Sequence, residues 1–243
     1  MNILVLNGSP KKDKSDTMHI TNAFLEGMNQ SAGNEITVVH TVEKSVHYCN
    51  GCLTCMRGNG QCTYKDDMSE ILQLIHKCDV LILSFPLYCY GMPASLKAVI
   101  DRILPLSRMT MRKVGDRYEH EERNDYSNKR YVMICGCGFP NSKNNFEAAI
   151  IQFQLMFGTE STVITIPESP LFNISLAQPV TEPRLELVKQ AGQELMEKNY
   201  VSSDLLQKLS IPMIPEEDYA KGVNEVSAPV PKHVSEDSLM NYI

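Results

Sequence analysis

Five short, mostly apolar runs alternate with amphipathic segments along the first 200 residues. The runs occupy residues 3–6, 36–39, 80–83, 131–134 and 163–166. Apolar runs of this length are typical of strands buried on both faces of a parallel sheet. Between them, apolar side chains recur at helical spacing, as Ile20, Phe24 and Met28 do. The pattern predicts βαβ units, and therefore an α/β fold with helices on both faces of a five-stranded parallel sheet.

The connecting segments carry ordinary helix signals. Asp66 or Asp67 is a candidate N-cap for one helix, and Pro93 suits the first turn of another. Helices are expected over residues 20–28, 68–75, 93–103, 146–157 and 185–195. Because such sheets bind ligands at the carboxyl ends of their strands, function is expected in the loops after the first, third and fourth strands.

Two regions fall outside this alternation. Residues 105–128 are too long for a simple connection, and the Gly115 turn between two β-type segments predicts a hairpin insertion near the ligand edge. Residues 201–243 contain four prolines and a helical stretch only near 216–225, so they are interpreted as a C-terminal extension or dimer arm. The last ten or so residues are expected to be disordered. Residues 1–200 then form the main domain.

Composition narrows the class of protein. Of 243 residues 43% are hydrophobic, and 23 basic residues against 29 acidic ones leave a net charge of −6. This balance argues against nucleic acid or an anionic membrane as the main partner. No apolar run approaches the roughly 18 residues that cross a bilayer, and the first ten residues lack a basic segment and a cleavage signal. A cytoplasmic protein is expected.

The loop after the first strand has the features of a phosphate site. Asn7-Gly8-Ser9-Pro10 leads through lysines to Ser15-Asp16-Thr17 and a helix. Free amides and the positive dipole at a helix start suit a phosphate, and hydroxyls add further donors. Neither the P-loop nor the dinucleotide fingerprint is present. An ordinary serine-capped turn is the alternative.

The other two loops are suited to a flat ring. The segment from Ser84 to Pro93 combines aromatic residues, a glycine and two prolines at a strand end. The Cys135-Gly136-Cys137-Gly138 segment follows the fourth strand, where glycines allow the backbone to approach a ligand closely. Together the three loops predict one crevice with a phosphate at one end and a planar heterocycle at the other.

Eight cysteines are present, and four of them fall within fourteen residues, at Cys49, Cys52, Cys55 and Cys62. In a long chain of a reducing compartment, this crowding indicates metal ligands rather than disulfides. Zinc prefers two separated Cys-x-x-Cys pairs, so it ranks second to an iron–sulfur cluster. A reduced structural loop without metal remains an open alternative.

The chain resembles the flavodoxin-like NAD(P)H-dependent FMN reductases. The resemblance is carried by Gly8-Ser9-Pro10 with Ser15 and Thr17, by Pro86-x-Tyr88, and by Pro93-x-x-Leu96-Lys97-x-x-x-Asp101-Arg102. It implies strand order 2-1-3-4-5, bound FMN, and a homodimer or homotetramer. The flavodoxin pattern Thr-x-Thr-Gly-x-Thr is absent, which disfavours a pure one-electron carrier.

The resemblance also implies the residues that bind FMN. The phosphate residues are Ser9, Lys11, Ser15, Asp16 and Thr17. The residues around the isoalloxazine are Pro86, Leu87, Tyr88, Cys89, Tyr90, Gly91 and Met92, with Gly136, Cys137 and Gly138. The spacing of Cys49, Cys52, Cys55 and Cys62 resembles the compact motif of iron–sulfur flavoproteins, which implies a [4Fe–4S] cluster near FMN.

The function expected is an FMN-dependent oxidoreductase that takes hydride from NADH or NADPH. Its electrons pass to a small acceptor such as a quinone, a nitro or azo compound, or a flavin. Because the flavin supplies the chemistry, no side chain is assigned as a catalytic acid or base. Two rivals remain: an iron–sulfur flavoprotein carrier fed by ferredoxin, and a non-enzymatic module that senses metal or oxidant through its cysteines.

Overall fold

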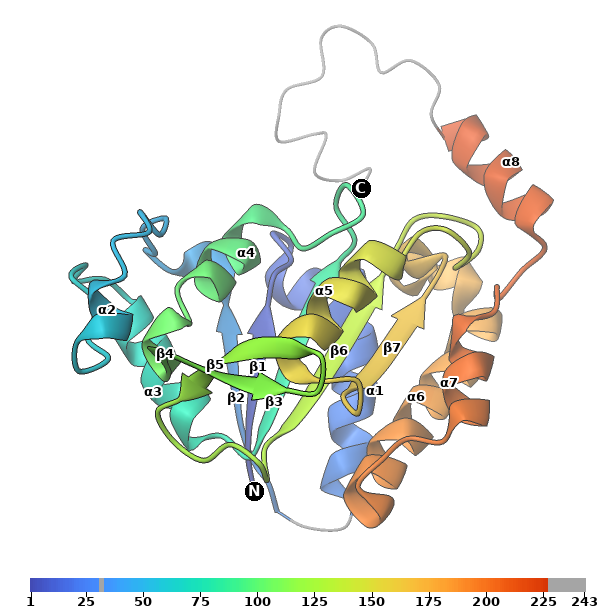
Figure 1. Ribbon diagram of the computed structural model, residues 1–243. Coiled ribbons are helices and arrows are strands. Elements are labelled where there is room, and N and C mark those ends of the chain that lie inside the picture. Colours follow the sequence, from blue (N-terminus) through green and yellow to red (C-terminus); the bar gives the residue numbers. More distant parts are fainter. Residues whose placement is uncertain (31–32, 227–243) are drawn as a thin grey trace, which may run out of the picture.

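The computed structural model describes residues 1–30 and 33–226, so the disorder expected for the last ten residues lies outside the described part. A five-stranded parallel sheet forms its centre (Figure 1). The strands are β1 (Asn2–Asn7), β2 (Glu35–His40), β3 (Val80–Pro86), β6 (Arg130–Gly136) and β7 (Thr162–Ile166). Their order, β2-β1-β3-β6-β7, is the predicted 2-1-3-4-5 order once the hairpin strands are set aside.

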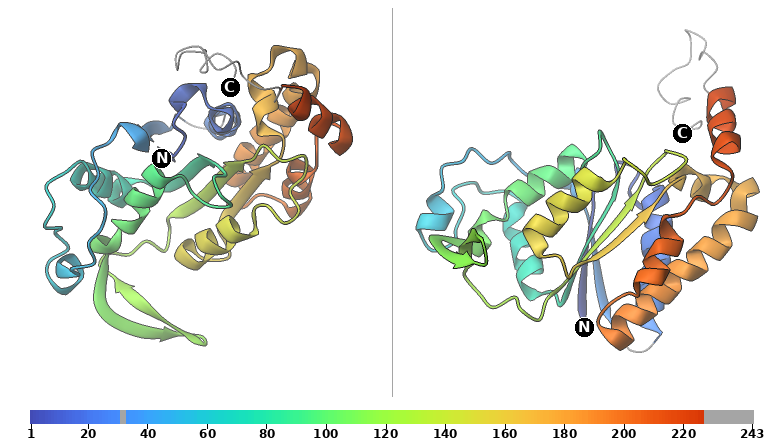
Figure 2. Two further views of the ribbon diagram at one scale, coloured as in Figure 1. Left: turned by 90° about the horizontal axis from the view of Figure 1, so that it is seen from above. Right: turned by 45° about the vertical axis from the view of Figure 1, so that its right-hand side comes forward.

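Helices cover both faces of the sheet, as predicted (Figures 1 and 2). One face packs against α1 (Asp16–Asn29), α6 (Gln178–Lys198) and α7 (Ser203–Ser210). The other packs against α3 (Met68–Lys77), α4 (Ala94–Asp101) and α5 (Glu147–Phe157). Alternation along a strand divides the core, since Ile3 and Val5 join the first layer while Leu4 and Leu6 join the second.

The start of α6 differs from the prediction, whereas α3 begins at Met68 as predicted. Helix α6 begins at Gln178 rather than near residue 185. Pro179 falls in its first turn, which tolerates proline, while Pro183 lies inside the helix. At α3, Asp67 occupies the cap position, but its carboxylate accepts from the Ser45 amide at 2.8 Å. Asp66 instead accepts from the Met68 amide at 3.3 Å, so only one of the two candidates supports the helix start.

The predicted hairpin exists as a separate antiparallel pair, β4 (Ser107–Val114) and β5 (Arg117–Glu122). Its placement near the ligand edge was wrong. The cleft beside it is lined by the hairpin, by Tyr131 at the start of β6, and by Leu155–Gly158 at the end of α5, without any residue of 86–92. In Figure 2 the hairpin projects away from the sheet. Two β-type segments around a turn predict that a hairpin forms, but not where it packs.

The chain after residue 200 begins as part of the core. Val201, Leu205 and Leu209 pack into the layer beneath α1 and α6. Helix α8 (Glu216–Val226) follows where a helical stretch was predicted. The remaining short elements are η1 (Lys12–Lys14), η2 (Thr41–Glu43), α2 (Thr54–Arg57), η3 (Leu104–Leu106), η4 (Ser169–Asn173) and η5 (Ser175–Ala177). Among the helices described, none is long and apolar enough to span a bilayer.

Candidate functional site

The three predicted loops meet at the carboxyl edge of the sheet, the upper edge in Figure 1. The first loop (residues 8–15) is tied to β3, because the Gly8 amide donates to the Ser84 carbonyl at 2.8 Å. The second loop (residues 87–93) is tied to β6, because the Leu87 amide donates to the Gly136 carbonyl at 2.8 Å. Neighbouring strands therefore bring together residues 76 and 49 positions apart in the chain.

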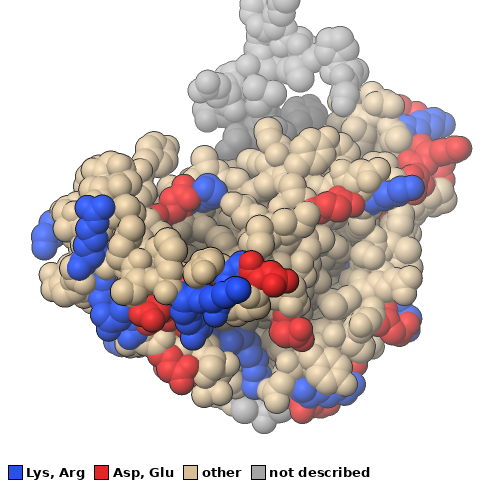
Figure 3. All heavy atoms as spheres, viewed as in Figure 1, with Lys and Arg blue, Asp and Glu red and all other residues tan. Residues whose placement is uncertain are grey.

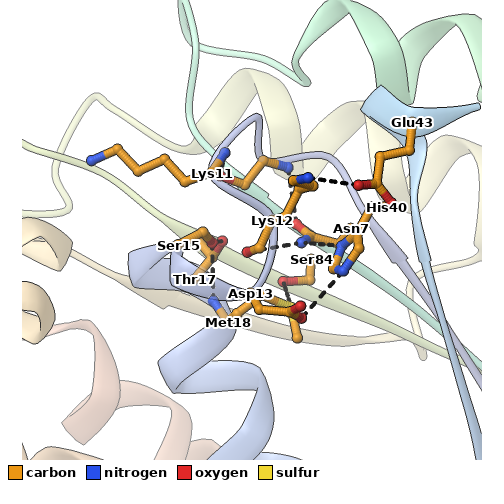
Figure 4. Close-up of polar contacts among 11 residues, drawn as sticks. Asn7, Lys11, Lys12, Asp13, Ser15, Thr17, Met18, His40, Glu43 and Ser84 are labelled. Atoms are coloured by element: carbon orange, nitrogen blue, oxygen red, sulfur yellow. Dashed lines mark hydrogen bonds and ion pairs between the residues drawn. The ribbon is translucent and has the colours of Figure 1, made fainter. Parts of the chain in front are cut away.

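A fully buried amide, Asn7, organises the first loop (Figure 4). Its Oδ1 accepts from the Ser9 amide at 2.9 Å, and its Nδ2 donates to the Lys12 carbonyl at 3.3 Å. The same Nδ2 lies 3.0 Å from His40 Nδ1, at the end of β2. His40 Nε2 in turn lies 3.2 Å from the Asp13 carboxylate. The loop is thus held in shape by side chains at the ends of β1 and β2.

The start of α1 presents polar groups towards the same edge. Ser15 caps the helix, since its Oγ accepts from the Met18 amide at 3.1 Å, and it lies 2.7 Å from Thr17 Oγ1. Both hydroxyls are buried. Among the residues described, no group accepts from the amides of Asp16 and Thr17. Two free amides and two hydroxyls at a helix start are suited to an anion.

The remaining residues predicted for the phosphate lie in different situations. Ser9 is buried, and its Oγ accepts from the Lys11 amide at 3.3 Å. The Lys11 side chain extends away from the network in Figure 4. The Asp16 carboxylate is bound by the Asn173 side chain from η4, so only its backbone faces the helix start. Asp16 therefore offers an anion its backbone amide and not its side chain.

A tight turn shapes the second loop. Tyr88 and Gly91 bond to each other through both backbone pairs, at 3.0 and 2.9 Å. The two residues between them, Cys89 and Tyr90, have φ values of 48° and 64°, the left-handed pair that such a turn requires. Tyr88, Cys89 and Tyr90 are exposed, whereas four residues of the predicted ring site are half-buried. These four are Pro86, Leu87, Gly91 and Met92.

Glycine is required at Gly136, where the third loop begins. A Cβ there would lie 2.7 Å from Ser169 Cβ and 3.2 Å from Thr17 Cγ2. The neighbouring Cys137 thiol points into the core, where burial raises its pKa to about 11. Gly138 is exposed, and the Phe139 ring after it stacks on Tyr90 with centroids 6.0 Å apart. The second and third loops therefore present one aromatic surface.

The four clustered cysteines line one small cavity to the side of this edge, near α2 in Figure 1. Cys49 and Cys52 are exposed, Cys62 is half-buried and Cys55 is buried. Hydrogen bonds from Thr54 lower the pKa of Cys52, whereas burial raises the pKa of Cys55. Within residues 1–30 and 33–226, no three metal-ligating side chains stand close enough together to hold an ion. The four thiols therefore lie around one cavity, but no three of them are close enough to ligate one ion.

A buried cation borders the same cavity. Arg102, at the end of α4, is 2% exposed and pairs with both oxygens of Asp66, at 2.9 and 3.0 Å. It also donates to the His47 carbonyl at 2.6 Å and lies over the Tyr64 ring. Its Nε is buried without a partner among the described residues. Arg102 thus keeps one free N–H donor beside four thiols, while its charge is already paired with Asp66.

A second arginine holds the far side of the cysteine loop (residues 49–62). Arg123 Nη2 donates to the carbonyls of Cys55, Met56 and Gly58, at 2.8, 3.1 and 2.8 Å. Cys55 and Met56 belong to the short helix α2 and Gly58 caps it, and the Cys55 carbonyl also accepts from the Gly60 amide at 3.1 Å. Arg123 follows β5, so the hairpin supports the cysteine loop. Figure 3 shows Lys and Arg side chains gathered on this side of the molecule, with Asp and Glu among them.

Sequence reasoning missed the residues that position the site. Asn7 was named only as the start of the first-loop segment, His40 ends its strand outside any motif, and Arg123 was given no role. Arg102 was identified only as part of a family pattern. The one available signal was the Asn directly after the first apolar run. An Asn at the end of a buried strand is itself expected to be buried, and a buried Asn needs hydrogen-bond partners.

Comparison with known proteins agrees with this architecture. Residues 1–160 match the family model described as a flavodoxin-like fold. An iron–sulfur flavoprotein of Archaeoglobus fulgidus is 38% identical over 98 residues, which cover 40% of this chain and 43% of that protein. The chain spans about half the length of the curated relatives it matches.

Solved structures show the same fold at low identity. An FMN-dependent NADH-azoreductase from Bacillus anthracis, solved with FMN, has a TM-score of 0.58 at 18% identity, covering 81% of this chain and 99% of that one. An NAD(P)H:quinone oxidoreductase from Methanothermobacter marburgensis also has a TM-score of 0.58 at 18% identity, covering 80% and 98%. Since the family model spans about two thirds of its length, the chain belongs to the family with the flavodoxin-like fold.

Proposed function

We propose that the protein binds FMN at the carboxyl edge of the sheet and catalyses electron transfer from NADH or NADPH to a small acceptor. The acceptor classes are quinones, nitro or azo compounds, and flavins. The observation that carries the proposal is the meeting of a helix start rich in free donors with an exposed aromatic surface. Relatives and structural neighbours with flavin in their names support it.

The residues present fit FMN. The amides of Asp16 and Thr17, with the hydroxyls of Ser9, Ser15 and Thr17, suit a phosphate monoester. Gly136 lets the third loop lie against Thr17 and Ser169, where a Cβ would clash. A dinucleotide is disfavoured because its glycine-rich fingerprint is absent.

The chain positions the reactants and leaves the redox chemistry to the cofactor. When bound, FMN would accept a hydride and release its electrons to the acceptor. The turn at Tyr88–Gly91 would border the ring, and its peptide groups offer donors and acceptors to the polar ring edge. Tyr90 and Phe139, 51% and 43% exposed, stack nearly parallel, and an outer ring face would suit a nicotinamide or an aromatic acceptor. No side chain is assigned to proton transfer.

The test begins with the phosphate. Replacing Ser15 by Ala and Thr17 by Val removes two hydroxyls, one of which donates to the other, so at least one donor worth about 1.5–3 kcal/mol to a charged group is lost. The FMN dissociation constant, measured by fluorescence titration, should rise at least about tenfold. Ser202→Ala is the matched control, because Ser202 occupies the cap position of α7 without a capping bond. Unchanged affinity in the double variant contradicts the phosphate site.

Electron supply is tested by stopped-flow absorbance under anaerobic conditions. NADH or NADPH should bleach the flavin in one two-electron step. If neither nucleotide does so while reduced ferredoxin bleaches it rapidly, the protein is an electron carrier instead. Size-exclusion chromatography tests the expected homodimer or homotetramer.

A second candidate function is that of an iron–sulfur flavoprotein carrier. One observation favours it: four thiols and the unpartnered Arg102 Nε border a single cavity. Helix α4 joins this cavity to the second loop, and its eight residues span about 12 Å. Anaerobic protein should then contain about four irons and four sulfides per chain, and Cys52→Ser should remove both while FMN stays bound. One zinc per chain supports the metal-sensing module, and iron-free active protein leaves a structural loop.

A further inference from the structure

The hydrogen-bond directions around Asn7 determine where the proton of His40 lies (Figure 4). The Ser9 amide can only donate, so the Asn7 atom facing it at 2.9 Å is Oδ1. The Lys12 carbonyl can only accept, so the Asn7 atom facing it is Nδ2. The same Nδ2 faces His40 Nδ1 at 3.0 Å, and Nδ1 must therefore be unprotonated. The proton of the neutral ring lies on Nε2 and points to Asp13.

Protonation of His40 disturbs this arrangement. It places an N–H on Nδ1, opposite the amino group of Asn7, so two donors face each other. Turning the Asn7 amide over would relieve that contact, but it would set two donors together at Ser9 and two acceptors together at Lys12. Asn7 is fully buried, so water cannot compensate for the lost bonds.

The charged groups around the ring offer little in return. Asp13, from η1, would gain an ion pair with the protonated ring, but its side chain is 81% exposed. Glu43, from η2, is already paired with Lys12 at 2.6 Å. Exposed ion pairs contribute less than a buried hydrogen bond left unmade. The neutral ring is therefore the form that fits the described loop.

We propose that His40 is a pH-sensitive positioning residue for phosphate binding. In its neutral Nε2–H form it holds Asn7, and through Asn7 the first loop, in the shape that presents the start of α1 to a phosphate. Its protonation loosens the loop. This proposal rests on the proposed FMN site. A histidine suits such a role because it is the side chain whose charge ordinarily changes between about pH 5 and 8.

The experiment compares FMN affinity from pH 8 to pH 5.5 in wild type, His40→Asn and Asp13→Asn. Asn keeps an acceptor near the Nδ1 position but does not titrate there. Wild-type affinity should fall about tenfold more than that of His40→Asn, the equivalent of one hydrogen bond. The second ionisation of the FMN phosphate, at about pH 6, affects both proteins equally. Asp13→Asn should follow wild type. Parallel profiles of wild type and His40→Asn would overturn the proposal.

A second readout needs no FMN. Nitrogen-15 spectra of the flavin-free protein should show the Nε2–H tautomer of His40 at pH 8, and the Nδ1–H tautomer there contradicts the proposal. At pH 5.5 the Ser9 amide should exchange at least about tenfold faster in wild type than in His40→Asn. If wild type binds no FMN at any pH, the proposed function fails, while these two measurements still decide the role of His40.

Discussion

The first loop and the cysteine loop follow neighbouring strands, β1 and β2, yet they are held in different ways. The first loop depends on nearby groups: Asn7 ends its own strand, and His40 ends the adjacent one. The cysteine loop has local turns, but it also depends on distant arginines: Arg123 binds its Cys55 carbonyl, 68 positions away, and Arg102 binds His47 and Asp66 on either side of it. The first loop is shaped as the sheet forms, whereas the cysteine loop also needs α4 and the hairpin.

This difference has a functional meaning. The first loop presents free donors at a helix start, so it is ready for a phosphate before any ligand arrives. The cysteine loop gathers its thiols around a cavity without bringing them to ligating positions. A metal or cluster that binds at the cysteine loop would have to draw the thiols into ligating positions. The two regions should therefore respond differently to substitution.

Arg102→Gln should produce the largest effect, a loss of stability at the cysteine loop. It leaves the Asp66 carboxylate, 2% exposed, without its cation, and losing one member of a buried pair costs about 3–5 kcal/mol. Urea unfolding measures the change, with Arg108→Gln on the exposed strand β4 as control. The FMN affinity of the folded fraction should stay the same. A loss of stability below about 1 kcal/mol contradicts this role of Arg102.

Gly136→Ala tests the phosphate side of the molecule, where the third loop lies against the start of α1. Its methyl group would meet Ser169 Cβ at 2.7 Å, and overpacking of this kind costs about 1–3 kcal/mol. The contact with Thr17 should also weaken FMN binding. Gly138→Ala is the matched control, because its methyl group would lie 3.7 Å from Pro170 Cγ, an ordinary contact. Thermal unfolding and FMN titration should separate the two variants, and equal behaviour contradicts the steric argument.

Acid should loosen the cysteine loop through Asp66. Burial opposes its ionisation, but hydrogen bonds from Arg102 and His47 lower its pKa to about 2, against 3.8 ordinarily. A lowered folded-state pKa stabilises the protein above about pH 4, and this contribution, about 2 kcal/mol, is lost as the pH falls towards 2. Between these values wild type should lose about 2 kcal/mol more unfolding free energy than Asp66→Asn. Parallel curves contradict the prediction.

The smallest effect is expected on the exposed face of α4, the helix that joins the two regions. Lys97 and Asp101 form an i,i+4 pair at 2.6 Å, with side chains 41% and 48% exposed. Such pairs contribute about 0.5 kcal/mol or less and weaken with salt. Lys97→Gln should stay within that limit in urea unfolding. A loss of unfolding free energy above about 1 kcal/mol would mean that the exposed face of α4, rather than its buried ends, limits the stability of both regions.

Much of the fold and part of the site were predictable from local patterns. The five apolar runs became the five sheet strands because burial on both faces selects unbroken apolar stretches. The Ser15 cap and the Cys89–Tyr90 turn also depend on residues close together in the chain. The hairpin strands were predicted, but their place in the molecule was not, since β4 contacts α2, about 50 to 60 residues earlier in the chain.

The sequence by itself determined the order of strands and helices, the helix start that offers free donors, and the crowding of four cysteines. Each follows from spacing within one segment. Only the tertiary structure decided that Asn7 and His40 share a hydrogen bond, that Thr17 lies against Gly136, and that Arg102 and Arg123 hold the cysteine loop. These contacts join residues 33 to 119 positions apart, and their energies depend on burial and bond geometry, which appear only when the sheet brings its strand ends together.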